Sequence, residues 1–166
     1  MACIVVLPAP PMERRHRTRD EAGTMKIKIL LVDDDREIVE LVESHFRSLG
    51  YAVRSVTDPS TALAMVKREN FQIVISDIHM PEKNGADLLA QIKRYNGAIK
   101  VFMITGHEVQ DDILACMRRG AETCLFKPLN DLQPLQNAVN EAVGKIEKWQ
   151  EILKRGKNQQ ESAATL

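Results

Sequence analysis

The sequence has few aromatic residues, no excess of charge of either sign and no long apolar run. Aromatic side chains make up 4% of the 166 residues, and 23 basic side chains are balanced by 23 acidic ones. A chain without net charge has no overall attraction to nucleic acid or to an anionic membrane surface. No apolar stretch approaches the roughly 18 residues that a membrane-spanning helix requires. We therefore expect neither direct nucleic-acid binding nor membrane insertion.

Cysteine is also scarce, and its distribution does not suit a protein held together by disulfides. Cys3, Cys116 and Cys124 show no spacing typical of a metal site, and an odd number with no close pair argues against a disulfide framework. We expect reduced thiols in a cytoplasmic protein, with Cys124 as a small core residue.

Apolar residues are abundant enough to form a core. They make up 44% of the chain, whose length suits one domain of roughly 100–150 residues with tails. Residues 1–24 are aperiodic and are expected to form a disordered N-terminal extension. Met25 stands where a start codon is expected, so one hypothesis is that translation begins there. N-terminal sequencing that found Met1 retained would reject this hypothesis.

From residue 25 onward, short apolar runs alternate with stretches of helical periodicity. Because parallel strands need helical crossovers, this alternation predicts one doubly wound α/β domain over residues 25–145. Its five-stranded parallel sheet should carry helices on both faces. Asp35 and Asp58 are expected to cap helices, and Gly50 to end one. The predicted strands are 27–32, 51–56, 71–76, 100–105 and 122–126.

Polar residues stand where four of these strands end. Asp33 and Asp34 follow the first strand, Asp77 the third, Thr105 ends the fourth and Lys127 follows the fifth. The carboxyl ends of parallel strands share one edge of a sheet, where ligands of such folds bind. We therefore expect these side chains to converge on one crevice.

This combination of groups suits phosphoryl chemistry. Two carboxylates about 4 Å apart repel by about 4 kcal/mol in a surface-like dielectric, so a cluster of them favours a hard dication such as Mg²⁺. A carboxylate beside the metal can attack phosphorus and form an aspartyl phosphate. A lysine and a hydroxyl can then stabilise the phosphoryl oxygens.

The motifs resemble those of the receiver domain of bacterial response regulators, the phosphoacceptor domain of two-component signalling. They read 31-LVDDD-35, 76-SDIHMPEKNG-85, 104-ITGH-107 and 119-RGAETCLFKPL-129. The resemblance covers about residues 26–145 and implies a flavodoxin-like fold. It also implies a partner histidine kinase or histidine phosphotransfer protein, and a signalling domain rather than an enzyme with turnover.

The resemblance assigns roles to individual residues. It implies that Asp77 is phosphorylated and that Asp33 and Asp34, with Asp77 and the backbone carbonyl of His79, hold Mg²⁺. Asp34 would be the direct ligand of the acidic pair.

The resemblance also assigns the switch. Thr105 would bond a phosphoryl oxygen, and Lys127 would pair with the phosphoryl group and precede a cis peptide bond to Pro128. Output would pass through the face made by the fourth helix, the fifth strand and the fifth helix to a downstream protein.

Cys124 departs from the family pattern. Receivers usually carry Tyr or Phe three residues before the lysine, and here that position holds Cys124. Phe126 is expected to have the opposite parity on the strand and so not to substitute. Phosphorylation should survive this change, but output coupled to an aromatic side chain is in doubt.

Three residues are expected to shape access to the phosphoryl group. Gly106 leaves space beside Thr105, and His79 and His107 flank the site. The histidines either adjust access and hydration or transfer protons during dephosphorylation, because imidazole titrates near neutrality.

The C-terminal helix has apolar positions that recur every three or four residues. The first half is expected to pack on the sheet, whereas residues 146–156 extend beyond the domain and leave Trp149 and Leu153 without a sheet beneath them. This overhang could form a homodimer, fold back, bind a partner or fray. Residues 157–166 are expected to be a disordered tail. No output domain follows, so we expect a stand-alone receiver or a fragment of a longer protein.

Two other functions remain open. A phosphohydrolase of the haloacid-dehalogenase type uses two aspartates two residues apart, which Asp33 and Asp35 match. However, Glu37 stands where Thr or Val is usual, and no acidic pair follows Lys127. The second alternative is a receiver-shaped interaction module that is never phosphorylated.

Overall fold

The computed structural model describes residues 26–81, 84–106 and 110–163, and of residues 157–163 only the backbone. Five strands alternate with five helices in the described chain. The strands are β1 (Lys28–Val32), β2 (Ala52–Val56), β3 (Ile73–Asp77), β4 (Lys100–Thr105) and β5 (Thr123–Phe126). The helices are α1 (Arg36–Ser48), α2 (Pro59–Arg68), α3 (Gly85–Tyr95), α4 (Gln110–Arg118) and α5 (Gln133–Ala163).

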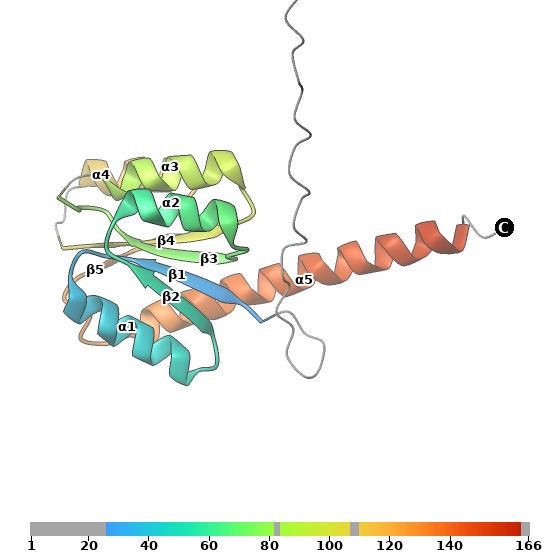
Figure 1. Cartoon of the computed structure of the whole chain (residues 1–166), viewed down its shortest axis with the longest axis horizontal. Coiled ribbons are helices and arrows are strands. Elements are labelled where there is room, and N and C mark those ends of the chain that lie inside the picture. Colours follow the sequence, from blue (N-terminus) through green and yellow to red (C-terminus); the bar gives the residue numbers. More distant parts are fainter. Residues whose placement is uncertain (1–25, 82–83, 107–109, 164–166) are drawn as a thin grey trace, which may run out of the picture.

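The strands form one parallel sheet in the order β2-β1-β3-β4-β5. Helices α2, α3 and α4 cover one face, and α1 and α5 cover the other (Figure 1). The predicted doubly wound, flavodoxin-like α/β fold is therefore confirmed. The expected N-terminal extension, residues 1–24, lies outside the described residues.

Each inner strand contributes to two cores because successive side chains point to opposite faces. Leu30 and Val32 pack beneath α2 and α3, whereas Ile29 and Leu31 pack against α1 and α5. Burial on both faces explains why the strands are almost continuously apolar. Each fully buried aliphatic side chain contributes roughly 1.5–3 kcal/mol.

Local signals set several helix ends as the sequence predicts. Asp35 accepts a hydrogen bond from the Glu37 backbone N–H at 2.9 Å and caps α1. Asp58 caps α2 in the same way. Gly50 has φ 89°, a left-handed conformation that suits glycine after a helix. These predictions are confirmed.

Helix α5 is longer than predicted. Its first half is anchored, with Leu135 and Val139 fully buried against the sheet. It continues to Ala163, so the prediction of a disordered tail from residue 157 is wrong for residues 157–163. Residues 157–163 include Lys, Gln, Glu and Ala, which favour helix. Gly156, just before them, lowers the stability of the helix by only about 1 kcal/mol.

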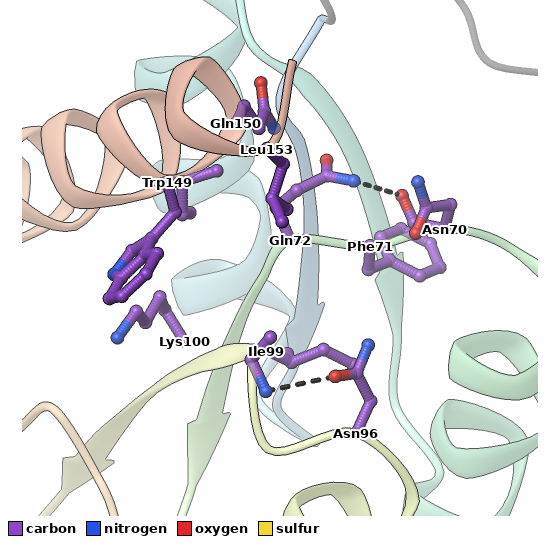
Figure 2. A pocket seen from close by; sticks show the side chains of 11 residues that line it. Asn70, Phe71, Gln72, Asn96, Ile99, Lys100, Trp149, Gln150 and Leu153 are labelled. Atoms are coloured by element: carbon purple, nitrogen blue, oxygen red, sulfur yellow. Dashed lines mark hydrogen bonds between the residues drawn. The ribbon is translucent and has the colours of Figure 1, made fainter. Parts of the chain in front are cut away.

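The part of α5 that extends beyond the domain, from residue 146 onward, lies over a groove at the amino edge of the sheet. The groove has a volume of about 430 Å³, and its walls include Phe71, Ile99, Trp149 and Leu153. Figure 2 shows Trp149 and Leu153 on the helix, above Gln72, which precedes β3, and Lys100, which begins β4. Among the helices in the described part of the chain, none has an apolar stretch long enough to cross a membrane.

Candidate functional site

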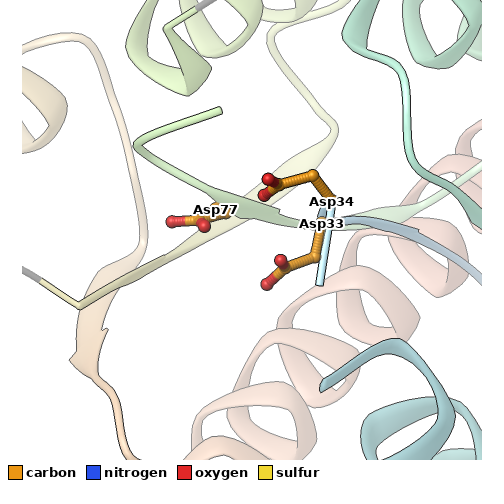
Figure 3. A group of neighbouring side chains, drawn as sticks. All are labelled: Asp33, Asp34 and Asp77. Carbon is orange, nitrogen blue, oxygen red and sulfur yellow. The ribbon is translucent and has the colours of Figure 1, made fainter. Parts of the chain in front are cut away.

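The sheet brings the predicted site residues of β1 and β3 side by side. Val32 at the end of β1 is paired with Ser76, so Asp33 and Asp77, one residue further on, lie level with each other. The chain order reverses between these two strands, which is where doubly wound sheets bind ligands. Figure 3 shows Asp33, Asp34 and Asp77 gathered at this edge.

The three carboxylates are close enough to share a metal ion. One oxygen from each of Asp33, Asp34 and Asp77 lies within 4.8 Å of the others. Asp33 and Asp77 are buried, and Asp34 is exposed. Oδ2 of Asp33 is buried and lies 2.9 Å from the Lys127 ammonium, although no donor meets it in good hydrogen-bond geometry. A hard dication would satisfy this oxygen, so the donor set fits Mg²⁺.

Lys127 reaches the same carboxylates from β5. Its Nζ lies 2.9 Å from Oδ2 of Asp33 and 3.0 Å from Oδ2 of Asp77. The peptide bond from Lys127 to Pro128 is cis, as expected. One ammonium thus neutralises part of the charge of two buried carboxylates.

The burial of this cluster changes its ionisation. Burial raises the pKa of Asp33, and the Lys127 ammonium beside it only partly opposes this. Burial alone would lower the pKa of Lys127, but its contacts with Asp33 and Asp77 outweigh burial and raise it. Lys127 is therefore held as a cation within the site.

Thr105 completes the expected set. It is buried at the end of β4, and its backbone carbonyl accepts a hydrogen bond from the Lys127 N–H at 2.8 Å. Gly106 follows and is exposed, and a Cβ there would lie 3.9 Å from the Lys127 side chain. His107 lies outside the described residues.

His79 points toward α4. Its backbone N–H donates to Oδ1 of Asp77 at 3.2 Å, and its ring Nε2 lies 3.0 Å from Oδ2 of Asp112. Asp112 lies 33 positions further along the chain, so the sequence carries no signal for this pair. It links the loop after Asp77 directly to α4.

Gly85 is a site residue that the sequence analysis did not single out. A Cβ at this position would lie 1.9 Å from the backbone carbonyl oxygen of Asp77, where only glycine fits. The Gly85 N–H also donates to the Ile78 carbonyl at 2.7 Å. The one available signal is a glycine at the first position of a helix, directly after the capping residue Asn84.

Comparison with known proteins decides the family. The family model described as the response regulator receiver domain matches residues 29–140. The chain belongs to this family. Receiver domains of this kind are signalling domains of two-component systems.

The receiver domain has similar relatives among curated and solved proteins. It is 33% identical over 118 residues to the transcriptional regulatory protein ZraR of Klebsiella oxytoca, covering 71% of this chain and 26% of that protein. It is 31% identical over 130 residues to GlrR of Escherichia coli, covering 75% of this chain and 29% of that protein. This chain therefore spans about a quarter of the length of these regulators.

Solved receiver domains have the same fold. A response regulator receiver domain from Clostridium thermocellum is 29% identical, with a TM-score of 0.68 over 74% of this chain and 98% of that one. A receiver domain of an HD domain-containing protein from Pseudomonas fluorescens is 27% identical, with a TM-score of 0.70 over the same shares.

Cys124 occupies the position where the resemblance led us to expect Tyr or Phe. This side chain is half-buried and packs against the core beneath α4, so the expectation of a core position is met only in part. The expectation of opposite parity for Phe126 is wrong. Because Cys124 and Phe126 are two residues apart on β5, they face the same side of the sheet. Phe126 is 47% exposed there.

Proposed function

We propose that this receiver domain accepts a phosphoryl group on Asp77, in a Mg²⁺-dependent reaction, from a histidine kinase or a histidine phosphotransfer protein. The observation that carries the proposal is the position of Lys127 Nζ, within 3.0 Å of Oδ2 of Asp77 and 2.9 Å of Oδ2 of Asp33. A cation beside the nucleophile and beside the acidic pair is what phosphoryl transfer requires.

Asp33, Asp34, Asp77 and the backbone carbonyl of His79 would hold the metal. When bound, Mg²⁺ supplies positive charge against the carboxylates and the incoming phosphoryl oxygens. The fit rests on the mutual distances of the three carboxylate oxygens and on their negative charge, which the single ammonium of Lys127 offsets only in part.

The side chains of the domain perform the transfer. An oxygen of Asp77 forms a bond to phosphorus as the bond from phosphorus to the donor nitrogen breaks, and the donor histidine is protonated. Lys127 moves its hydrogen bond from Asp77 to a phosphoryl oxygen, and the Thr105 hydroxyl donates to another. Hydrolysis of the acyl phosphate later restores the carboxylate.

The phosphorylated state would signal through protein contacts. Thr105 ends β4 and is paired with Phe126 of β5. A movement of Thr105 would therefore change the packing at the face formed by α4, β5 and α5. The contact between His79 and Asp112 offers a second link to α4. The difference in the affinity of the two states for phosphate and metal sets the upper limit of the population shift.

The overhang of α5 is the second proposed interface. Trp149 is 65% exposed and Leu153 is 63% exposed on the same part of the helix. We propose that a second copy of the chain covers them. Sedimentation of the full chain against a truncation after Gly144 tests this: a lower mass for the truncation supports the dimer, and equal monomer masses reject it.

The main experiment is labelling with acetyl phosphate and Mg²⁺, read by intact mass. We expect a gain of one phosphoryl group that Asp77→Asn and removal of Mg²⁺ abolish. Asp87→Asn is the matched control, because Asp87 is an exposed carboxylate of α3 that pairs with Arg119. It should be labelled like the wild type.

Other outcomes would support the alternative functions. A domain that binds Mg²⁺ but gains no phosphoryl group would favour an interaction module. Steady turnover of a small phosphate ester by Asp77→Asn would favour a phosphohydrolase.

His79→Ala and His107→Ala separate the two roles open to the histidines. If they transfer protons, the phosphoryl lifetime should lengthen in the variants and lose its dependence on pH. If His79 only adjusts access, its loss should change the lifetime equally at all pH values. Unchanged lifetimes in both variants would reject both roles.

A further inference from the structure

Two cysteines meet between α4 and β5. Cys116, in α4, is buried in the core between the helices and the sheet, and Cys124, in β5, packs against that same core, with the two thiols near enough to influence each other's ionisation. The chain is turned back between them by Gly120, which has φ 92°, and by a hydrogen bond from the Ala121 N–H to the Cys116 carbonyl at 3.1 Å. The sequence analysis expected no close pair, because it considered spacing alone.

The contact is the main buried attachment of α4. Cys116 is the one fully buried residue of this helix, and Cys124 packs against the same core. Leu114 and Met117, the larger apolar residues of α4, are about half exposed, at 50% and 44%. A change at the two sulfurs would therefore act directly on how α4 is held.

The two thiols have different chemistry. The neighbouring Cys116 thiol lowers the pKa of Cys124 in spite of its burial, whereas Cys124 and burial raise the pKa of Cys116. Cys124 is also the more accessible of the two. Because the thiolate is the reactive form, Cys124 would react first with an outside reagent and Cys116 would react second.

We propose that Cys116 and Cys124 form a reversible disulfide that fastens α4 to β5, with a small-molecule disulfide as the oxidant. The proposal does not depend on phosphorylation of Asp77. Disulfides in reducing compartments are typically transient and redox-sensing, which suits a bond formed by exchange.

The exchange has two steps. The Cys124 thiolate attacks one sulfur of the small disulfide, which forms a mixed disulfide and releases one small thiolate. Cys116 then loses its proton and attacks the Cys124 sulfur, which forms the intramolecular bond and releases the second thiolate. Overall, two protein thiols lose two electrons and two protons, and one small disulfide becomes two small thiols.

The test is a redox titration of the full chain carrying Cys3→Ser, with reduced and oxidised glutathione as the probe. Free thiols are alkylated and counted by mass, and tryptic peptides are mapped. Trypsin cleaves after Arg118 and Arg119, so a bond between Cys116 and Cys124 would join two peptides. We expect both thiols to disappear together, the joined peptides to appear, and dithiothreitol to reverse the change.

Single variants show the order of reaction. Cys116→Ala should stop at a mixed disulfide of Cys124 with glutathione, and Cys124→Ala should stay unmodified because Cys116 is buried. Circular dichroism confirms that both variants are folded. A wild-type pair that remains reduced, that accumulates only mixed disulfides or that links two chains would overturn the proposal, whatever the variants do.

Discussion

The two edges of the sheet differ in what they bury and what they expose. At the carboxyl edge, Asp33, Asp77 and Thr105 are buried polar residues beside Lys127. At the amino edge, the groove beneath α5 is lined by a mixture of apolar and polar side chains, and the large apolar residues Trp149 and Leu153 are exposed. Burying charge costs stability unless it is paired, and exposing large apolar surface marks a contact site. The same sheet therefore has the candidate phosphorylation site at its carboxyl edge and a candidate interface at its amino edge.

Closing the small space beside Asp77 should have the largest effect. Gly85→Ala would place a Cβ 1.9 Å from the Asp77 carbonyl, and the backbone cannot yield easily. We expect a loss of about 3 kcal/mol in the free energy of unfolding, the upper range for overpacking. Denaturant unfolding measures it.

Gly144→Ala is the control for this substitution. Gly144 lies in α5 with nothing near its added Cβ, so this variant should gain roughly 1 kcal/mol through helix propensity. Equal effects of the two substitutions would show that the space beside Asp77 is not restricted.

Removing the cation from the carboxyl edge should have the next largest effect. Lys127→Met leaves the buried carboxylates Asp33 and Asp77 without their ion pair, which should cost about 2 kcal/mol of unfolding free energy without metal, less than the roughly 3–5 kcal/mol of a fully buried pair because Lys127 is partly exposed. Mg²⁺ should stabilise this variant more than the wild type, because the ion replaces the missing charge.

Denaturant unfolding of Lys127→Met with and without Mg²⁺ measures both its loss of unfolding free energy and its stabilisation by the metal. Lys100→Met, which removes a partly exposed pair with Glu122, is the control and should show no difference in its response to Mg²⁺. A Lys127→Met protein as stable as the wild type, with or without metal, would contradict the assigned charge balance.

Truncating the exposed apolar residues should change association and leave folding unaffected. Trp149→Ala with Leu153→Ala should alter the unfolding free energy by less than about 0.5 kcal/mol, as exposed substitutions usually do. The dimer should weaken by roughly 30-fold or more, as for a residue central to an interface. Sedimentation over a concentration series measures this, and Lys148→Ala is the neighbouring control. A stability loss without a change in mass would place the two side chains in the fold instead.

Lys93 should show the smallest effect, and it tests a partly buried charge away from the site. It donates to the Ile99 carbonyl at 2.7 Å, and burial lowers its pKa from the usual 10.5. The folded state therefore releases this proton at a lower pH than the unfolded state does. The cost of burying the charge is full below the folded pKa and disappears as pH rises to 10.5.

The wild type should accordingly gain stability relative to Lys93→Met between neutral pH and pH 10.5. Unfolding measured at both pH values checks the sign. A difference between the two proteins that is constant with pH would contradict the buried charge.

Much of the fold and of the site was accessible from the sequence because the signals are local. Asp35 and Asp58 cap helices through hydrogen bonds within three residues, and Gly50 ends α1 through its own backbone conformation. The end of α5 was misplaced because helix propensity in the tail is a weak signal. Phe126 was placed on the wrong face by an error of strand parity.

The contacts that the sequence did not reveal join residues distant in the chain. His79 meets Asp112 across 33 positions, and Cys116 meets Cys124 only because the chain turns back at Gly120. Gly85 is required because α3 begins in contact with the Asp77 carbonyl. The sequence around Gly85 does not reveal how closely these two backbone segments approach.

The sequence by itself determined the alternation of strands and helices and the polar residues at the ends of four strands. These follow from hydrophobic periodicity and from the shared direction of parallel strands. Only the tertiary structure decided which side chains touch: Lys127 between two carboxylates, the paired thiols and the groove beneath α5. Such contacts depend on packing distances between elements, and periodicity carries no information about those distances.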